Sequence, residues 1–423
     1  MTLRLAKTKQ KPMRPTSNLR NPFAFIVAAM VLSAPLHSMN AASLTVEAGS
    51  VSRRASIVTA TLPATLGGIQ YLRTANGKII PIQVSADGEA AFILEELSSG
   101  KSARLELLPA SSEAQAVAGI QTTREGKKLK LKSADRSILE YQADPSELPR
   151  PDLTQIYQRG GYLHPIFSPA GRPVTDDYPS NHKHHHGIWF PWTKTEFEGR
   201  HPDFWNMGDG LGRVEFVAMD RHWSGSVHGG FRARHRFIDL TGETPKAALN
   251  EEWEVRVYKP GRLSGGRPCH VFDLISSQQC AGTSALKLPQ YHYGGLGFRG
   301  HWDWNGEANT TFLTSEGETN RVKGNETGGR WCHIGGVVDG MRTGIAVLGH
   351  PGNFRAPQPM RLHPGEPFFC FAPQQLGEFE ITPGKPYVSR YRFVVFDGLA
   401  DRAEIDQAWE DYAQPAKVTF IDR

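Results

Sequence analysis

The chain has 423 residues, of which 39% are hydrophobic and 22% charged, and its formal net charge is +5. These proportions are typical of a soluble globular protein, and 43 glycines and 29 prolines indicate many turns. Six lysines and arginines lie before residue 43, in a stretch without acids, so the rest of the chain is almost neutral. A neutral chain gives no electrostatic support for binding nucleic acid or an anionic membrane.

The N-terminal residues have the pattern of a secretory signal. The basic residues lie between positions 4 and 20, an uncharged run follows at 23–34, and small residues follow at 41–43. The apolar run is shorter than the roughly 20 residues that cross a bilayer, although an uncleaved anchor or a disordered tail is the alternative. We therefore expect residues 1–42 to be a signal peptide, and a periplasmic or extracellular chain with no membrane span after its removal.

The remaining residues predict two β-rich domains. Residues 43–135 contain brief strands between glycine and serine clusters, which favours a small β-sandwich. Residues 136–423 hold all the tryptophans, and the strand at 252–258 alternates apolar and charged side chains as a half-buried antiparallel strand does. A single amphipathic helix is predicted at 401–412. The chain is therefore expected to be mainly β, with a large antiparallel β-sandwich, a small N-terminal one and a C-terminal helix.

Four cysteines leave the redox state open. In an oxidising compartment Cys269, Cys280, Cys332 and Cys370 could form disulfides, and Cys269 to Cys280 is the plausible local one. Buried free thiols are the alternative. The spacing of the four residues does not match a zinc–thiolate site.

Histidines are concentrated in one part of the chain. Nine of the sixteen lie within residues 164–235, and four of these within 182–186. If this run enters a strand, the side chains of His182, His184 and His186 lie on one face and that of His185 on the other. His182 and His184 could then bind zinc or copper with a third ligand from elsewhere, or the histidines could act as acid and base. An exposed polar turn is the alternative.

Aromatic side chains flank the histidine run. Trp189 follows it directly, and the loop 201–210 contains Trp205 and Asn206. A solvated loop has little use for such residues, whereas aromatic faces beside hydrogen-bonding groups suit the apolar C–H faces of a sugar. Asp203 in this loop could bind a metal or a hydroxyl, or simply cap a turn. We expect Trp189, Trp205 and Asn206 to contact a carbohydrate.

Three further segments contain candidate site residues. His164 precedes a proline, which favours extended backbone. The glycines of segment 290–300 indicate close backbone approach to a ligand, with Tyr293 as a proton donor and Arg299 as an anchor for a carboxylate or oxyanion. The proline-rich loop at 350–360 is also a candidate. In that loop Asn353 and Arg355 could bind substrate, although a structural loop is the alternative.

Several segments together resemble the DUF6807 family over roughly residues 140–400. The family's usual histidine run is similar to Asp-His-Pro-His-His-Arg-Gly, whereas Asn181, Lys183 and His186 stand here at its Asp, Pro and Arg positions. These departures put in doubt a role for an acid or an arginine there. The segments that carry the resemblance are Gly161–Gly171, Asn181–Phe190, Asp203–Asn206, Tyr293–Arg299 and His350–Asn353.

The resemblance implies a secreted, mainly β protein often encoded among bacterial carbohydrate-degradation genes. It also implies a fold similar to the galactose-mutarotase-like supersandwich, whose members act on sugars with histidines and a carboxylate on a concave sheet. The family is often labelled PmoA, after a methane oxygenase subunit. That subunit is an integral membrane protein, which a chain without a span beyond its signal does not match.

The leading hypothesis is a secreted carbohydrate-active enzyme: an epimerase, lyase or hydrolase of a sugar or modified sugar. His184 and His185 would share acid–base catalysis, with His164 and Tyr293 assisting and Arg299 holding the substrate. No paired carboxylates of a usual glycosidase are evident, which weakens simple hydrolysis. A noncatalytic carbohydrate-binding or surface protein and a copper-dependent oxidase are the alternatives.

Overall fold

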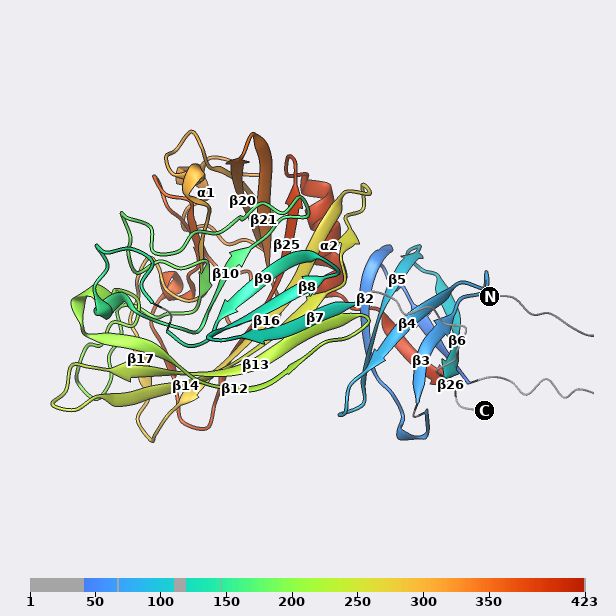
Figure 1. The fold of residues 1–423 in the computed structure, drawn as a ribbon, viewed down its shortest axis with the longest axis horizontal. Helices are drawn as coiled ribbons and strands as arrows, with labels where there is room; N and C mark the ends of the chain where they lie inside the picture. The colour runs from blue at the N-terminus through green and yellow to red at the C-terminus, as the bar shows by residue number, and fades with distance from the viewer. Residues whose placement is uncertain (1–41, 67, 110–118, 146, 422–423) are drawn as a thin grey trace, which may run out of the picture. The chain divides into compact units, whose positions relative to one another are not determined.

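Figure 1 shows the computed structural model, which describes residues 42–66, 68–109, 119–145 and 147–421. The predicted signal peptide, apart from its last residue, lies outside these ranges. Within them, no helix has the length and apolar character that crossing a bilayer requires.

A seven-stranded antiparallel sheet forms the first module, in the order β2-β5-β4-β3-β6-β1-β26. Its core is apolar and includes Leu44, Val58 and Phe92. The chain returns to this module at its end, because β26 pairs with β1 (Ser43 opposite Ile421). The strands are β1 (Ser43–Glu47), β2 (Arg53–Thr61), β3 (Ile69–Arg73), β4 (Ile79–Val84), β5 (Glu89–Leu97), β6 (Ser102–Pro109) and β26 (Lys417–Ile421).

An eight-stranded antiparallel sheet follows, in the order β22-β23-β18-β11-β10-β9-β8-β7. Strands β7 and β8 were expected in the small domain, yet β8 pairs here with β9, and β7 pairs with β8 at the edge of this sheet. Leu129 and Leu131 of β8 are buried in the larger core, while Lys128, Lys130 and Lys132, which alternate with them, point away from it. The strands are β7 (Ile120–Glu125), β8 (Lys128–Ser133), β9 (Arg136–Gln142), β10 (Tyr162–Ile166), β11 (Ile188–Trp189), β18 (Gly297–Arg299), β22 (Met360–Leu362) and β23 (Phe368–Phe371).

A nine-stranded antiparallel sheet completes the large sandwich, in the order β12-β13-β14-β16-β25-β21-β20-β19, with β15 beside β16. The predicted strand at 252–258 lies within β14, where Trp253, Val255 and Val257 are fully buried. The strands are β12 (Gly212–Trp223), β13 (His228–Asp239), β14 (Lys246–Tyr258), β15 (Gly261–Arg262), β16 (Pro268–Cys280), β19 (Thr311–Thr314), β20 (Trp331–Val338), β21 (Met341–Gly349) and β25 (Tyr387–Asp397).

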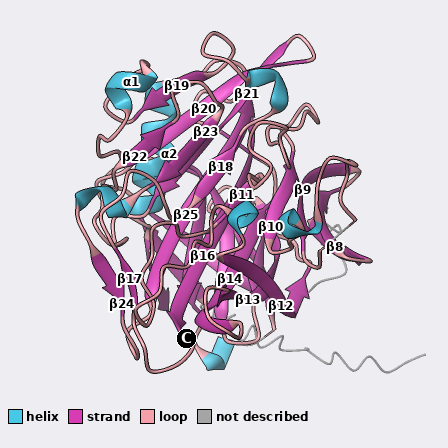
Figure 2. Ribbon diagram, turned by 90° about the vertical axis from the view of Figure 1, so that its left-hand side faces the viewer, coloured by secondary structure: helices cyan, strands magenta, loops and turns pink. Residues whose placement is uncertain are grey.

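Strands dominate the described chain, and helices are few and short (Figure 2). The predicted C-terminal helix is confirmed as α2, and Asp401 caps it by accepting hydrogen bonds from the backbone of Ala403 and Glu404. The remaining elements are the pair β17 (Leu286–Leu288) and β24 (Phe379–Ile381), the helices α1 (Arg321–Gly324) and α2 (Arg402–Ala413), and the 3-10 turns η1 (Ala64–Leu66), η2 (Gln155–Tyr157), η3 (Met207–Asp209), η4 (Trp302–Trp304) and η5 (Pro373–Leu376).

One apolar core joins the eight- and nine-stranded sheets. It includes Leu163 and Phe298 from the first sheet and Phe272 and Phe393 from the second. Because side chains alternate along a strand, the neighbours of these core residues in the eight-stranded sheet face away from the core. The prediction of a mainly β, antiparallel sandwich is therefore confirmed. The eight-stranded sheet has a second face, which does not pack against this core.

The four cysteines are free thiols. Cys269 and Cys280 lie near the two ends of β16, and a strand rises by about 3.3 Å per residue, so they are roughly 36 Å apart. The alternative of a local disulfide is therefore wrong, and that of free thiols is confirmed. Cys332 and Cys370 are fully buried, in strands of different sheets.

A hydrogen-bonded chain of polar side chains crosses the sandwich core. His235 Nδ1 donates to Glu251 Oε2 at 3.0 Å, and the Tyr141 hydroxyl donates to His235 Nε2 at 2.6 Å. The other carboxylate oxygen of Glu251 accepts from Ser276 Oγ (2.6 Å) and Gln278 Nε2 (2.8 Å). All five side chains are at most 2% exposed, so each depends on its partners for hydrogen bonds that water cannot replace.

We predict that Glu251→Ala lowers the free energy of unfolding by about 3–5 kcal/mol, because it leaves buried donors without an acceptor. Urea denaturation followed by tryptophan fluorescence measures this change. Glu215→Ala on the exposed side of β12 is the matched control, and should change stability by no more than about 0.5 kcal/mol. A loss below about 1 kcal/mol for Glu251→Ala would show that the network contributes little.

Candidate functional site

The histidine run is a turn, and not the start of a strand. The backbone N–H of His182 donates to Pro179 O (3.0 Å), that of His185 to His182 O (2.8 Å), and that of Tyr178 to His185 O (3.0 Å). Strand β11 begins only at Ile188. The expected placement of His182 and His184 on one strand face is therefore wrong, because Pro179 and the polar residues after it favour turns.

In this turn the imidazole rings lie together, and not on opposite faces as they would in a strand. His182 stacks on His185 with ring centroids 4.6 Å apart, and His184 packs edge-on against His185 at 4.7 Å. His363, from the connection between β22 and β23, reaches the same cluster at 5.7 Å from His182. Residues nearly two hundred positions apart in the chain therefore meet here.

The imidazoles border a cavity of about 280 Å³ on the outer face of the eight-stranded sheet. Three predicted catalytic residues (His184, His185 and Tyr293) and two predicted binding residues (Trp205 and Asn206) are among those that border it. The lining residues are His182, His184, His185, Trp205, Asn206, His292, Tyr293, Arg361, His363 and Phe368.

Aromatic rings form the wall of this cavity. Phe368 stacks on His185 at 5.0 Å, and Trp205 packs edge-on against Tyr293 at 5.0 Å. Trp189 contacts both His185 and Trp205 at 5.2 Å but is fully buried. Trp189 therefore supports the wall from behind, and the substrate contact predicted for it is not available in this geometry.

Burial keeps the histidines uncharged. It lowers the pKa of His184 and that of His363 to about 4, and holds the pKa of His185 well below its ordinary value. Neighbouring imidazoles and the nearby Arg299 guanidinium add to this effect, because they oppose a further positive charge. Burial also raises the pKa of Tyr293 to about 12, so its hydroxyl stays protonated. At neutral pH the cavity therefore offers free-base imidazoles and a phenolic donor.

Arg299 was expected to hold the substrate, but it lies behind the histidine turn. Its side chain is fully buried, forms an ion pair with Glu366 (Nη1 to Oε2, 3.0 Å), and donates from Nη2 to Asn305 Oδ1 at 2.7 Å. It does not border the cavity. Its charge is already balanced by a carboxylate, so its observed contacts position the turn.

His164 also lies outside the cavity lining. Its Nδ1 is 3.0 Å from Thr175 Oγ1, within the sheet region beside the turn. Nearby, Asp177 accepts from His186 Nδ1 (2.6 Å) and from the Tyr162 hydroxyl (2.9 Å). Burial raises the pKa of Asp177 to about 6. These contacts hold the histidine turn against the eight-stranded sheet. His164 does not line the cavity that His184 and Tyr293 border.

The loop at 350–360 has a structural role. Asn353 exchanges two hydrogen bonds with the backbone of Arg390, at 2.9 and 2.8 Å. Arg355 donates to three backbone carbonyls between Pro373 and Glu378, at 2.6 to 3.0 Å. Neither residue borders the cavity, so the substrate contacts predicted for Asn353 and Arg355 are not supported.

Sequence reasoning did not single out four of the lining residues: His292, Arg361, His363 and Phe368. Arg361 and Phe368 are single positions in the short strands β22 and β23, whose neighbours are core residues. His363 begins a His-Pro-Gly turn, the same tripeptide that drew attention at 350–352. This repeated tripeptide is the one local sequence pattern that could have indicated His363 as a candidate site residue.

The predicted metal site lacks ligands. In the part of the chain that the structure describes, no group of three or more His, Cys, Asp or Glu side chains is placed to hold a metal ion. The rings of His182 and His184 are 5.9 Å apart at their centroids. The donor set therefore gives no support for the expected zinc or copper ion.

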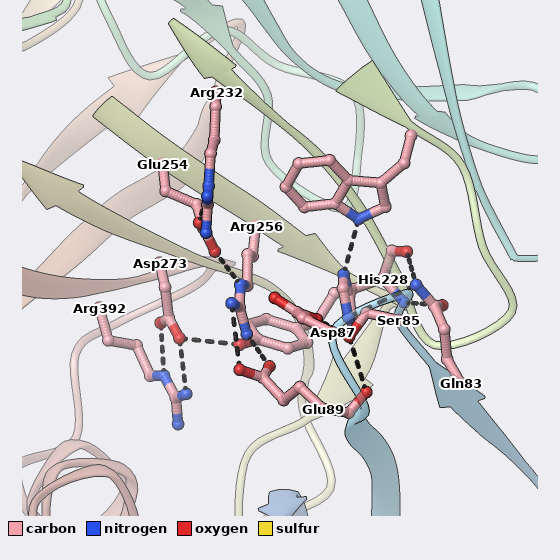
Figure 3. Close-up of polar contacts among 12 residues, drawn as sticks. Gln83, Ser85, Asp87, Glu89, His228, Arg232, Glu254, Arg256, Asp273 and Arg392 are labelled. Carbon is pink, nitrogen blue, oxygen red and sulfur yellow. Dashed lines mark hydrogen bonds and ion pairs between the residues drawn. The ribbon is translucent and has the colours of Figure 1, made fainter. Parts of the chain in front are cut away.

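A larger cavity, of about 760 Å³, lies where β4 and β5 meet the β12–β13 hairpin and β14. Figure 3 shows the contacts there: Gln83 bonds to the backbone of His228, and Glu89 forms an ion pair with Arg256. The polar groups drawn bind one another and tie the first module to the large sandwich. We therefore favour the smaller, histidine-lined cavity as the functional site.

The fold and this cavity together define an antiparallel β-sandwich protein with a neutral, histidine-rich site on the outer face of one sheet. Residues 128–410 match the family model described as "Family of unknown function (DUF6807)", so the chain belongs to this family. No curated protein matches the chain.

Two solved structures from Enterococcus faecalis are similar to the chain. One is a protein in the glycosyl hydrolase family 38 (8% identity, TM-score 0.42, 90% of this chain and 48% of that one). The other is an alpha-mannosidase of strain V583 (10% identity, TM-score 0.43, 90% of this chain and 46% of that one). This chain spans about half the length of each, and likeness at this level supports no functional argument.

Protonation of the buried histidines should make stability fall in acid. The pKa of His184 and of His363 is about 4 in the folded chain against an ordinary 6.5, so between these values the unfolded chain binds more protons. Above pH 6.5 both imidazoles are neutral in the folded and the unfolded chain, so they do not oppose folding. As the pH falls towards 4 they take up protons in the unfolded chain first, and this stabilises the unfolded state. We expect the urea midpoint to fall over this window, and to fall less in the double variant His184→Asn, His363→Asn.

The exposed His222→Asn is the control for this experiment, and it should follow the wild-type pH dependence. An identical acid slope in the wild type and the double variant would contradict the neutral state of these two half-buried imidazoles.

Elemental analysis of the untagged protein, purified without chelator, tests the metal hypothesis. We expect no stoichiometric zinc or copper, because the described donor set lacks a third ligand. A stoichiometric metal that is lost in His184→Ala would overturn this expectation and return the copper-dependent oxidase to consideration.

Proposed function

We propose that this protein is a secreted sugar-acting enzyme of the epimerase or lyase type, and that its chemistry is proton transfer in the histidine-lined cavity. The observation that carries the proposal is the meeting of free-base imidazoles, a protonated tyrosine and an aromatic wall around one small cavity. Secretion rests on the signal pattern of the first 42 residues.

His184 is the best placed proton acceptor. It is only half-buried, borders the cavity, and has no hydrogen-bond partner among the residues that the structure describes. Its low pKa, caused by burial, leaves the free base present at neutral pH. His185 packs below it, against Phe368 and Trp189, and would hold the substrate and share in proton transfer.

Tyr293 is the best placed proton donor. Its hydroxyl lies 3.4 Å from Asn206 Nδ2, which donates to it, and its ring packs on Trp205. Burial raises the pKa of Tyr293 to about 12, so its hydroxyl carries a proton at neutral pH. A base and an acid of different type are thus present in one cavity, as proton transfer requires.

The shape and lining of the cavity suit a sugar ring. Its volume of about 280 Å³ is near the lower end of small-molecule sites, which fits one or two sugar units. Trp205 and Phe368 provide apolar faces, while Asn206 and the imidazoles provide hydrogen-bonding groups. No aspartate or glutamate lines this cavity, so the paired carboxylates of usual glycosidases are not provided there, and simple hydrolysis is the less favoured reaction.

We predict that His184→Ala lowers kcat/KM on a sugar substrate at least about 100-fold, the usual contribution of a general base. Turnover of neutral and oxidised sugars, followed by proton exchange from solvent deuterium and by product chromatography, measures this effect. His222→Ala, an exposed histidine on β12, is the matched control and should retain wild-type turnover.

Two outcomes would contradict the proposal. Full turnover by His184→Ala would remove His184 as the base. Sugar binding by the wild type, without turnover or proton exchange of any sugar, would favour the noncatalytic carbohydrate-binding protein.

A further inference from the structure

We propose that the substrate is an acidic sugar, a uronate or aldonate, whose carboxylate is bound by Arg361. This inference rests on the proposed function and names the substrate class of the same cavity. It follows from the charge of the lining, the proton positions on two imidazoles and the chemistry that a carboxylate permits.

Arg361 is the single charged residue among the ten that line the cavity. It lies on β22 between two core residues, so its side chain projects from the outer face of the sheet. Its guanidinium donates a hydrogen bond from Nη1 to a neutral group, Asn325 Oδ1, at 3.1 Å. Among the described residues it has no ion-pair partner, in contrast to Arg299, which Glu366 neutralises at 3.0 Å.

The carboxylates nearest the cavity are already engaged or exposed. Asp203 accepts four hydrogen bonds from its own loop and Thr193, at 2.7 to 3.0 Å. Glu366 is paired with Arg299, and Glu326 is exposed beside Asn325. None of the three lines the cavity, so the positive charge of Arg361 is left for a bound anion.

The imidazoles also favour an acceptor-rich ligand. The Nδ1 atoms of His182 and His185 are buried and have no hydrogen-bond partner in the described chain. A buried N–H without an acceptor costs more than a buried lone pair, so the ring proton belongs on Nε2. Nε2 is then the nitrogen that can meet a bound molecule, as a donor. With Arg361 and the Tyr293 hydroxyl, the cavity presents several donors at once, which carboxylate oxygens can accept.

A carboxylate also makes the proposed chemistry feasible. A hydrogen on the carbon next to a carboxylate can pass to His184, and the electron pair of the broken C–H bond is then spread over the carboxylate oxygens beside Arg361. Transfer of the Tyr293 hydroxyl proton to the other face of that carbon gives the epimer, and the tyrosinate then regains a proton from solvent while His184 releases the one it took. Alternatively, the pair forms a C=C bond, the C–O bond at the next carbon breaks, and the leaving oxygen takes a proton from Tyr293. Neither route needs an oxidant or reductant.

Calorimetric titration of the full chain with matched sugars tests the inference. The probes are D-glucuronate and D-galacturonate against D-glucose, D-galactose and the methyl ester of D-galacturonate, at low ionic strength. We expect the acids to bind at least about tenfold more tightly than their neutral counterparts, a difference of about 1.4 kcal/mol. Arg361→Gln should remove this preference, Arg361→Lys should restore part of it, and Arg342→Gln on the exposed end of β21 should leave it unchanged.

The outcomes separate this inference from the proposed function. Neutral sugars that bind and turn over as well as the acids would overturn the acidic-sugar inference and leave the sugar-acting enzyme in place. A preference for acids that survives in Arg361→Gln would remove Arg361 as the anchor. If neither acidic nor neutral sugars bind, both proposals are overturned. Binding of acetate or inorganic phosphate alone would not rescue them.

Discussion

The alternation of side chains in the eight-stranded sheet is the constraint on which the rest of the structure depends. One set of residues, such as Leu163 and Phe298, enters the core shared with the nine-stranded sheet. The other set, which includes Trp189, Phe368 and Arg361, is left on the opposite face. The large sandwich therefore determines which side chains are available for a site, because a one-residue shift in register would exchange the two sets.

The histidine turn completes this face because its imidazoles are buried without charge. The stacked pair His182–His185 (4.6 Å) and the edge-on pair His184–His185 (4.7 Å) would repel one another if protonated. The hydrocarbon rings of Phe368 and Trp189 beside His185 do not replace the water that a charged imidazole would lose. The same burial that makes the cluster stable at neutral pH leaves it able to accept protons. At His184 and His185 the packing of the turn and the proposed proton transfer therefore both require a neutral imidazole.

The two arginines near the cavity illustrate how burial separates structural from binding roles. Arg299 is fully enclosed, and its charge is balanced by Glu366 within the turn region. Arg361 is less buried, and its guanidinium contacts a neutral amide. An uncompensated cation beside neutral imidazoles makes the cavity selective for anions, which links the architecture of β22 to the kind of sugar that the protein would process.

The sequence by itself determined the mainly β architecture and the C-terminal helix, and it indicated the histidine turn that borders the candidate cavity. Alternation in 252–258, the capped helix after Asp401, and the cluster of histidines beside tryptophans are local patterns, and local patterns reflect local physical preferences. Only the tertiary structure decided that β7 and β8 join the larger sheet, that Arg299 is buried, and that Arg361 and His363 line the same cavity as His182. These facts depend on strand pairing between distant segments, and a single residue in a short strand carries no local signal of its partner.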